Sequence, residues 1–396
     1  MKVGKVRAKL VEMFTRVISL VNTEKNTHIY WNGDDNLYPN EIERVINNSP
    51  TAFRASRLMA KFIGGSGVLN IANGLPFKYE ELPFVNSKKA YKITDIISIA
   101  SKDRSVQGGV WFHIGYGINE EGILYQKTID ILPYVKPRLS KEDDNDSQGK
   151  IFLKDWSISK NLFGSSKEKT KWYYPYNPNP KVVTAQIKAD AKDAIDLQEA
   201  IEHYRGQVFY LNYTPEFKYA LPPVDSVFND ADSEYRVGLY TNTQTRRGFL
   251  GKTIVVTQGL DVEQVDGVRD DLAKFLGSED SGDLYHLDVD QADDITKVIY
   301  VNQLKPQFDD KLFEVTDKRI RRNILGAFNN IPEALINASD GALFGTSADT
   351  YVQMKLFYSE QVEEDREKLQ ETLTYLGFPC KIIPIVEKTQ TPTENV

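Results

Sequence analysis

The chain has 396 residues, of which 41% are hydrophobic and 27% charged, and its formal net charge is −7. This composition is typical of a globular protein long enough for two or three domains. Proteins that bind nucleic acid through their general surface are usually basic, so any DNA contact of this acidic chain must be local or steric. The single cysteine, Cys380, excludes an internal disulfide, and we interpret it as a small packing residue. No secretory signal or apolar run long enough for a bilayer stands out, so we expect no membrane segment and a reducing compartment.

The first half of the chain alternates between helical and strand patterns. Apolar residues at helical spacing predict a helix over 3–20, and Asn36 and Pro39 precede a short predicted helix at 40–47. A second helix follows directly and ends near Phe62, before a glycine-rich stretch. The remaining elements expected here are a helix at 92–103, two strands within 108–129 around a turn at 119–122, a helix at 183–203 and a strand at 208–213.

Two further segments of the first half lack a regular pattern. The polar segment 136–150 predicts an exposed loop. The segment KWYYPYNPNP, 171–180, is aromatic and rich in proline. It has two interpretations, a recognition segment or side chains packed beneath a loop.

The second half consists of long helices interrupted by a small α/β insertion. The expected elements are, in order, a helix at 222–247 opened by Pro222 and Pro223, a strand at 253–257, a helix at 261–276, strands at 283–289 and 295–301, and helices at 306–328 and 347–376. Between the last two helices lies a nearly uncharged segment of Gly, Ala, Ser, Asn and Thr, far longer than a helix–helix turn requires. The fold class predicted from this order is α+β.

The sequence contains no strong motif for a nucleotide-binding, metal-binding or catalytic site. The segment RRGFLGKT, 246–253, ends like a phosphate-binding loop, but Arg246 stands where the first glycine is required, and the segment precedes a strand instead of following one. The acidic run DVDQADD, 288–294, is either a solvated surface or a metal-dependent nuclease site, which needs carboxylates converging from separate elements. The four histidines are scattered, so the sequence gives little support for a metal site. No Ser/His/Asp set, Cys/His pair or dinucleotide fingerprint stands out, so we expect no cofactor and no enzymatic activity.

The net charge is concentrated in the insertion. Residues 249–300 hold twelve acidic and four basic side chains, a local charge of −8, while the rest of the chain is close to neutral. This surface is interpreted as a docking site for a basic partner, as a repulsive collar around DNA, or as a device for solubility alone.

The order of these parts resembles that of the tailed-bacteriophage portal protein, the head-to-tail connector ring. The resemblance also rests on GDDNLYPNEIERVINNSP, 33–50, and on LGAFNNIPEALI, 325–336. It implies a wing at 1–221, stem helices at 222–248 and 302–328, a clip at 249–301, a tunnel loop at 329–346, a long wing helix at 347–377 and a reduced crown or disordered tail at 378–396. Many portal proteins carry a larger crown, so crown contacts are not carried over to this chain.

The resemblance also implies partners and a location. The expected assembly is a homo-oligomeric, dodecameric ring at the capsid vertex of a virion, assembled in the host cytoplasm. Double-stranded DNA would pass through it without sequence specificity during packaging and ejection. The expected protein partners are the major capsid protein, the large terminase and then a head–tail connector or adaptor protein, with no membrane.

Three groups of residues follow from this hypothesis. The tunnel loop would line the channel without Lys or Arg, because phosphate contacts bind DNA tightly. Its residues are Glu333, Asn337, Ser339, Asp340, Gly341, Leu343, Phe344 and Gly345. The clip would dock partners through Asp261, Glu263, Asp266, Asp270, Asp271, Asp288, Asp290, Asp293 and Asp294. The stem would pack within the helix pair or between neighbouring subunits through Val224, Phe228, Tyr235, Leu239, Phe308, Leu312 and Val315.

Two alternatives remain at this point. One is another virion adaptor or assembly protein with a similar helical stem and no DNA channel. The other is a metal-dependent enzyme acting on nucleic acid through the acids at 288–294.

Overall fold

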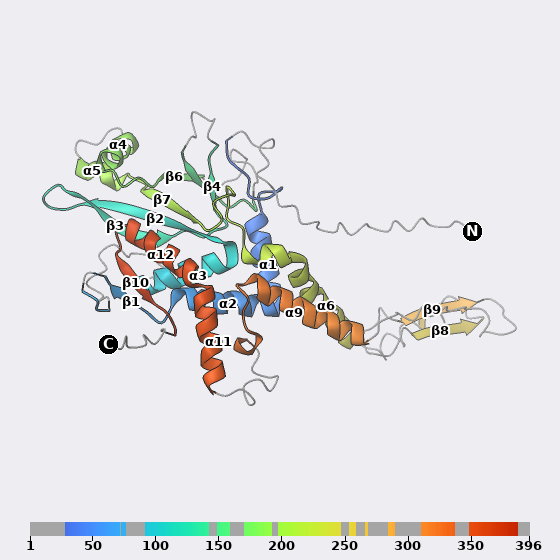
Figure 1. Cartoon of the computed structure of the whole chain (residues 1–396). Coiled ribbons are helices and arrows are strands. Elements are labelled where there is room, and N and C mark those ends of the chain that lie inside the picture. Colours follow the sequence, from blue (N-terminus) through green and yellow to red (C-terminus); the bar gives the residue numbers. More distant parts are fainter. Residues whose placement is uncertain are drawn as a thin grey trace, which may run out of the picture. The chain divides into compact units, whose positions relative to one another are not determined.

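The structure is a computed structural model, and Figure 1 labels its helices and strands. It describes residues 28–71, 73–76, 92–141, 149–158, 170–191, 197–246, 253–258, 266–267, 284–289, 310–336 and 348–386. The chain divides into two compact units. The first contains residues 1–232 and 319–396, and the second contains residues 233–318. The helix expected at 3–20 and the strand expected at 295–301 lie outside the described residues.

Two helices open the first unit where they were predicted. Helix α1 spans Tyr38–Asn48 and helix α2 spans Pro50–Gly64. Ser49 separates them, and its hydroxyl accepts a hydrogen bond from the backbone N–H of Ala52 at 3.1 Å, so it caps α2. Both helices bury one apolar face in the main core of the unit.

Helix α3 and a β-hairpin follow. Helix α3 spans Ile93–Gln107, four residues beyond its predicted end at 103. It ends at Gly108, whose φ is 78°, and a Cβ at that position would lie 2.2 Å from the carbonyl oxygen of Leu221. Only glycine fits there. Strands β2 (Gly109–Ile118) and β3 (Leu124–Ile131) then pair antiparallel, as predicted.

A six-stranded sheet forms the centre of the first unit. Its strand order is β3-β2-β7-β6-β5-β4, and among these pairs only β6–β7 is parallel. The added strands are β4 (Pro137–Leu139), β5 (Ile151–Leu153), β6 (Lys171–Pro175) and β7 (Gln207–Asn212). Helices α4 (Pro180–Asp190) and α5 (Leu197–Glu202) occupy most of the region predicted as one helix at 183–203.

The expectation of an exposed loop over 136–150 is wrong for its first residues. Pro137–Leu139 form a strand, and the Arg138 side chain is fully buried. Lys141, two residues after this strand, is also buried, so the polar composition of the segment did not indicate exposure. The aromatic segment 171–180 is also part of the fold: Trp172 and Tyr173 in β6 pack against core clusters, and Asn179 caps α4. These contacts support the packing interpretation.

Two faces of the sheet contribute to different cores. On β2, Val110, Phe112 and Ile114 belong to the main core, which α1, α2 and α3 also enter. Trp111 points the other way and stacks on Tyr210, with ring centroids 3.8 Å apart. This alternation is expected for a strand buried on both sides.

The long C-terminal helix predicted at 347–376 is two helices. Helix α11 spans Ala348–Gln361 and helix α12 spans Glu363–Tyr375, and Val362 between them has φ −106° and ψ 9°. Glu363, Glu364 and Asp365 form the first turn of α12, where negative charge is favoured. Those acids form a second helix start that the sequence interpretation missed.

The end of the described chain contains a strand. Residues 378–396 were expected to be a reduced crown or a disordered tail. Within them, Cys380–Ile383 form strand β10, which pairs antiparallel with β1 (Gly67–Asn70), so these residues are not a disordered tail. Residues 387–396 lie outside the described residues. Cys380 is fully buried, which confirms its interpretation as a packing residue. Its surroundings raise the thiol pKa to about 12 through burial.

The stem residues have different environments in the single chain. A short 3₁₀ helix, Pro223–Val227, precedes helix α6 (Phe228–Arg246), and Val224 in it is buried. Leu239 on α6 and Val315 on helix α9 (Asp310–Ala327) are 45% and 65% exposed. Phe228 and Tyr235 are half-buried. Phe308 lies outside the described residues, as does the side-chain environment of Leu312.

The second unit contains the predicted strands of the insertion. Strands β8 (Thr253–Gln258) and β9 (Leu284–Val289) pair in parallel, with Thr253 opposite Leu284. A parallel pair requires a crossover connection, in agreement with the helix predicted at 261–276. Of that helix the structure describes residues 266–267, which are helical.

Candidate functional site

The candidate site lies where helix α9 ends and the long uncharged segment begins. Asn329 and Asn330 have φ values of 60° and 55°, a left-handed conformation that asparagine adopts more readily than most residues. The backbone N–H of Asn330 donates to Gly326 O and that of Ile331 donates to Leu325 O. The sharp end of α9 is therefore held by its own backbone, and the chain enters Pro332 and the 3₁₀ turn Glu333–Leu335.

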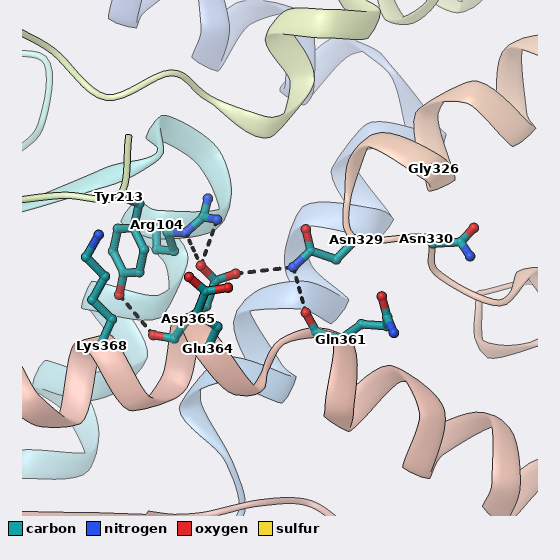
Figure 2. Close-up of a pocket in the computed structure, with 9 residues that line it drawn as sticks. All are labelled: Arg104, Tyr213, Gly326, Asn329, Asn330, Gln361, Glu364, Asp365 and Lys368. Atoms are coloured by element: carbon teal, nitrogen blue, oxygen red, sulfur yellow. Dashed lines mark hydrogen bonds and ion pairs between the residues drawn. The ribbon is translucent and has the colours of Figure 1, made fainter. Parts of the chain in front are cut away.

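A carboxylate on α12 connects this helix end to two other elements, as Figure 2 shows. Asp365 Oδ1 accepts a hydrogen bond from Arg104 Nε of α3 at 2.8 Å, and Arg104 Nη2 lies at the same distance. Asp365 Oδ2 accepts from Asn329 Nδ2 at 3.2 Å, and that amide also donates to Gln361 O at 3.1 Å. We call Asp365, Arg104, Asn329 and Tyr213 the Asp365 node.

Tyr213, directly after β7, completes this node. Its hydroxyl donates to the backbone carbonyl of Asp365 at 3.2 Å, and its ring lies 4.5 Å from the Arg104 guanidinium carbon. Burial raises the pKa of Tyr213; Arg104 opposes this effect and Asp365 adds to it. The phenol therefore stays protonated and remains a donor. The side chains of Arg104 and Asp365 are 14% and 11% exposed, so their ion pair is largely shielded from water.

A polar pocket of about 540 Å³ adjoins the node. Its lining residues are Arg104, Tyr213, Gly326, Asn329, Asn330, Gln361, Glu364, Asp365 and Lys368. Charges of both signs line it, and the dashed lines in Figure 2 mark the contacts that join Arg104, Tyr213, Asn329, Gln361 and Asp365. The side-chain amide of Asn329 is held by Asp365 and by the carbonyl of Gln361, so these contacts fix the position of the chain at Asn329.

The two described ends of the uncharged segment are both anchored in the first unit. The 3₁₀ turn Glu333–Leu335 contacts α11, and Leu335 and Ile336 pack on the main core. Tyr358 of α11 donates a hydrogen bond to Phe328 O at 3.0 Å. Arg366 of α12 donates to Ser359 O at 3.4 Å and to Phe62 O at 3.3 Å. Residues 337–347 are thus connected to an ordered base at both ends.

A second polar cluster explains the segment GDDNLYP, 33–39. Asn36 has φ 63° and is fully buried, and its side-chain oxygen accepts from Asn32 N and from Arg138 Nε. Arg138 also donates to the backbone carbonyls of Asn36, Val135 and Pro137 at 2.7 to 3.1 Å. We call Arg138 and these partners the Arg138 node. Burial lowers the pKa of Arg138 to about 10, so it remains a cation at neutral pH.

The same segment also reaches the start of the predicted stem. The Tyr38 hydroxyl donates a short hydrogen bond to Asp225 Oδ1, in the 3₁₀ helix that precedes α6. Further along α6, Asp230 Oδ2 accepts from Asn323 Nδ2 of α9 at 2.9 Å. The segment 33–39 is part of the motif on which the family resemblance rests. Through Tyr38 and Asn36 it connects the start of α6 to the sheet within the first unit.

The structure describes few of the predicted tunnel-loop residues. Glu333 is exposed in the 3₁₀ turn. The others lie outside the described residues: Asn337, Ser339, Asp340, Gly341, Leu343, Phe344 and Gly345.

The predicted clip acids are also mostly outside the description. Asp266 is exposed in its helical stretch, and Asp288 lies on β9 opposite Thr257. The remaining seven are not described: Asp261, Glu263, Asp270, Asp271, Asp290, Asp293 and Asp294. Because Asp288 alone of the acids at 288–294 is described, the structure does not test whether these carboxylates converge on one site.

Sequence reasoning missed the Asp365 and Arg138 nodes. A signal existed for the first: Leu369 and Leu373 form a buried apolar face on α12, and Asp365 lies one turn before Leu369 on that face. A charged residue on the same helix face as buried leucines is expected to have a buried partner, because an unpaired buried charge is costly. For Arg138 there was no local signal, because its side-chain partner Asn36 is 102 positions away.

Within the described ranges, no group of three or more His, Cys, Asp or Glu side chains could hold a metal ion. Within the same ranges, no helix combines the length and the apolar composition needed to cross a membrane.

No protein-family model matches the chain. No curated protein matches it either. Solved structures do: a chain in the virion of a native gene transfer agent (GTA) particle is 12% identical with TM-score 0.47, covering 93% of this chain and 88% of that one. A chain in the neck of an empty GTA particle, computed with C6 symmetry, is 12% identical with TM-score 0.45 and the same coverage. A chain in the neck of a native GTA particle, computed with C12 symmetry, is 11% identical with TM-score 0.47, covering 89% and 86%.

Proposed function

We propose that this chain is a portal-type subunit, which assembles into a ring around a channel for double-stranded DNA at the vertex of a phage-like capsid. One observation carries the proposal. A long, nearly uncharged segment, 337–347, connects to an ordered base at both ends, formed by the end of α9, the 3₁₀ turn and α11. Hydrogen bonds of Asn329 with Asp365, and of Tyr358 with the Phe328 carbonyl, fix the chain on either side of the segment. Fixed ends of this kind suit a segment that acts at a distance from the folded unit.

The composition of the segment supports a channel more than a binding loop. Residues 337–347 contain no Lys or Arg and one acid, Asp340. A DNA-binding loop gains affinity by releasing counterions through Lys and Arg, whereas a channel must let the duplex slide. On this proposal the segment acts sterically, and its small residues allow many copies to share one axis.

The exposed apolar side chains of the helices support assembly. Val237 and Leu239 on α6 and Val315 on α9 are 38%, 45% and 65% exposed in the single chain. On this proposal they pack between neighbouring copies, with the dodecamer as the expected ring.

The acidic insertion supports a docking role on this proposal. Its local charge of −8 would be repeated in every copy, and such a field steers basic partners over roughly 8–10 Å at physiological salt. The partners proposed for it are the large terminase and later a connector protein, with the major capsid protein contacting the first unit.

The test is a deletion of residues 337–343, compared with a variant in which the same seven positions carry a Gly-Ser sequence. Both should form rings with an axial hole in electron micrographs. The deletion should impair packaging or retention of DNA, and the length-matched control should lose much less. Purified wild-type protein that forms no ring, or a deletion that abolishes assembly while the subunit stays folded, would contradict the proposal.

A second test addresses the acids. Replacing Asp288, Asp290, Asp293 and Asp294 by Asn keeps size and removes charge. If docking dominates, partner association slows and loses its salt dependence. If repulsion dominates, the ring retains DNA at low salt. A ring unchanged in both properties would assign these acids to solubility.

A further inference from the structure

A second pocket, of about 390 Å³, lies between α2, α3 and the start of β1. Arg57 and Lys61, one turn apart on α2, line it together with Lys102 of α3. The hydroxyl residues Thr94 and Ser98 lie on the same wall, and none of the described residues that line the pocket is acidic. The three cations are exposed, so this pocket presents concentrated positive charge to solvent.

The positive charge continues along the outer face of α2. Arg54 is exposed one turn before Arg57, and Phe53 is 38% exposed. The Arg57 guanidinium lies 4.9 Å from the centroid of the Phe53 ring, which holds the cation on this face. We call Phe53, Arg54, Arg57, Lys61 and Lys102 the basic face. It combines an aromatic side chain with cations, as protein-binding surfaces commonly do.

The same chain carries a surface of opposite charge. Glu360 lies in the last turn of α11, and Glu364, Glu367 and Glu371 follow on α12 at spacings of four, three and four residues, with all four exposed. Within α12 this spacing places three carboxylates along one side of the helix. Phe357, 41% exposed, precedes them by one turn. We call Phe357 and these four glutamates the acidic stripe.

We propose that the basic face of one copy of this chain docks the acidic stripe of the next copy. A closed ring of identical subunits needs two different surfaces on each subunit that complement each other. The two surfaces described here match in charge, and each carries an exposed phenylalanine beside its charged residues. The inference rests on the proposed ring and adds to it the pair of surfaces that join neighbouring subunits.

Duplex DNA is the other occupant that a basic pocket could take, since phosphates also seek cations. Two observations favour the second copy. Phe53 supplies an apolar contact that a phosphate backbone would not use, and the acidic stripe supplies a complementary surface within the chain itself. DNA binding is therefore treated as an outcome that the experiment can detect.

The experiment exchanges the charges. One full-length variant carries Arg57→Glu and Lys61→Glu, a second carries Glu367→Lys and Glu371→Lys, and a third carries all four changes. Assembly is measured by light scattering across a concentration series. Each double variant should raise the concentration for half-assembly by about tenfold or more, because like charges then meet across the contact. The fourfold variant should recover most of the wild-type assembly.

A matched control exchanges exposed charges at the β2–β3 hairpin, with Glu121→Lys and Lys127→Glu, and should assemble as the wild type does. Circular dichroism checks that every variant is folded. The inference would be overturned if both double variants formed rings as well as the wild type, or if the fourfold variant assembled no better than either double variant. The proposed ring would then still stand. Loss of DNA binding by the Arg57 and Lys61 variant without loss of assembly would assign the basic face to DNA. Wild-type protein that stays monomeric would overturn both proposals.

Discussion

Arg138 and Asp365 are both charged side chains inside the first unit, but their partners are of different kinds. Arg138 is fully enclosed and donates to three backbone carbonyls and the Asn36 amide, with no carboxylate among these partners. Asp365 borders an open pocket and pairs with a cation and an amide from two other elements.

The difference separates two uses of buried charge. The Arg138 node holds a turn and a strand in one arrangement, since every acceptor that Arg138 satisfies belongs to Asn36 or to the backbone of its own segment. The Asp365 node joins α3, α9 and α12, so it sets the place from which residues 337–347 begin. We expect variants of the first to affect the stability of the fold, and variants of the second to affect the uncharged segment as well.

The largest effect is expected for Arg138→Met, which keeps most of the side-chain volume and removes all donors. Several buried acceptors lose a partner, and we expect the free energy of unfolding of the subunit to fall by about 3 kcal/mol. Urea denaturation of the variant measures this loss. Arg322→Met, at an exposed position on α9, is the control and should change stability by less than about 0.5 kcal/mol. A similar loss in both variants would remove the special role of Arg138.

Asp365→Asn should have the next largest effect. The amide keeps the shape of the carboxylate but leaves the largely buried Arg104 without its counter-charge, and we expect a loss of about 2 kcal/mol. Glu120→Gln, at an exposed position between β2 and β3, is the control with almost no expected loss. A cycle with Arg104→Met then measures the coupling of the pair. Additive single effects would show that the two side chains do not stabilise each other.

Asn329 separates hydrogen bonding from backbone conformation. Asn329→Gly removes the side-chain bonds to Gln361 and Asp365 but accepts a φ of 60°, so we expect a loss of about 1 kcal/mol. Asn329→Ala removes the same bonds and adds the strain of a left-handed alanine, roughly 1 kcal/mol more. Thermal unfolding of the two variants compares them. Equal stability would show that the backbone is not held in this conformation.

The smallest effect concerns the thiol of Cys380, which shares the main core with α12. Burial raises its pKa to about 12, so in the folded protein at pH 8 it should react with a maleimide far more slowly than in urea. Asp365→Asn should raise the native labelling rate a few-fold, because it loosens the start of α12. Arg138→Met, whose node lies outside that core, should raise it less at the same temperature. The opposite ranking would contradict the separation of the two nodes.

Sequence patterns predicted the helices and strands whose signal lies within a few neighbouring residues. They missed the buried charged side chains whose partners are far away in the sequence. Periodicity predicted α1, α2 and the β2–β3 hairpin, and strand composition predicted β7, β8 and β9, because each pattern is complete within a few residues. Burial of Arg138 depends on Asn36, 102 positions away, and Asp365 depends on Arg104, 261 positions away. The break at Val362 was missed because helical spacing continues almost unchanged through one non-helical residue. Of the predicted site, Glu333, Asp266 and Asp288 fall within the described residues, and the roles assigned to the tunnel loop and the clip stay predictions.

The pairing of β1 with β10 has a consequence for how the protein is made. Ser66, beside β1, donates to Ile383 O at the end of β10, and the two residues are 317 positions apart. During synthesis, α1, α2 and β1 therefore leave the ribosome long before β10 has been made. Until then β1 cannot form its pairing with β10. Contacts between such distant residues form late and leave apolar surface open in the meantime. Released chains that end at residue 379 should consequently bind chaperones more strongly than full-length chains.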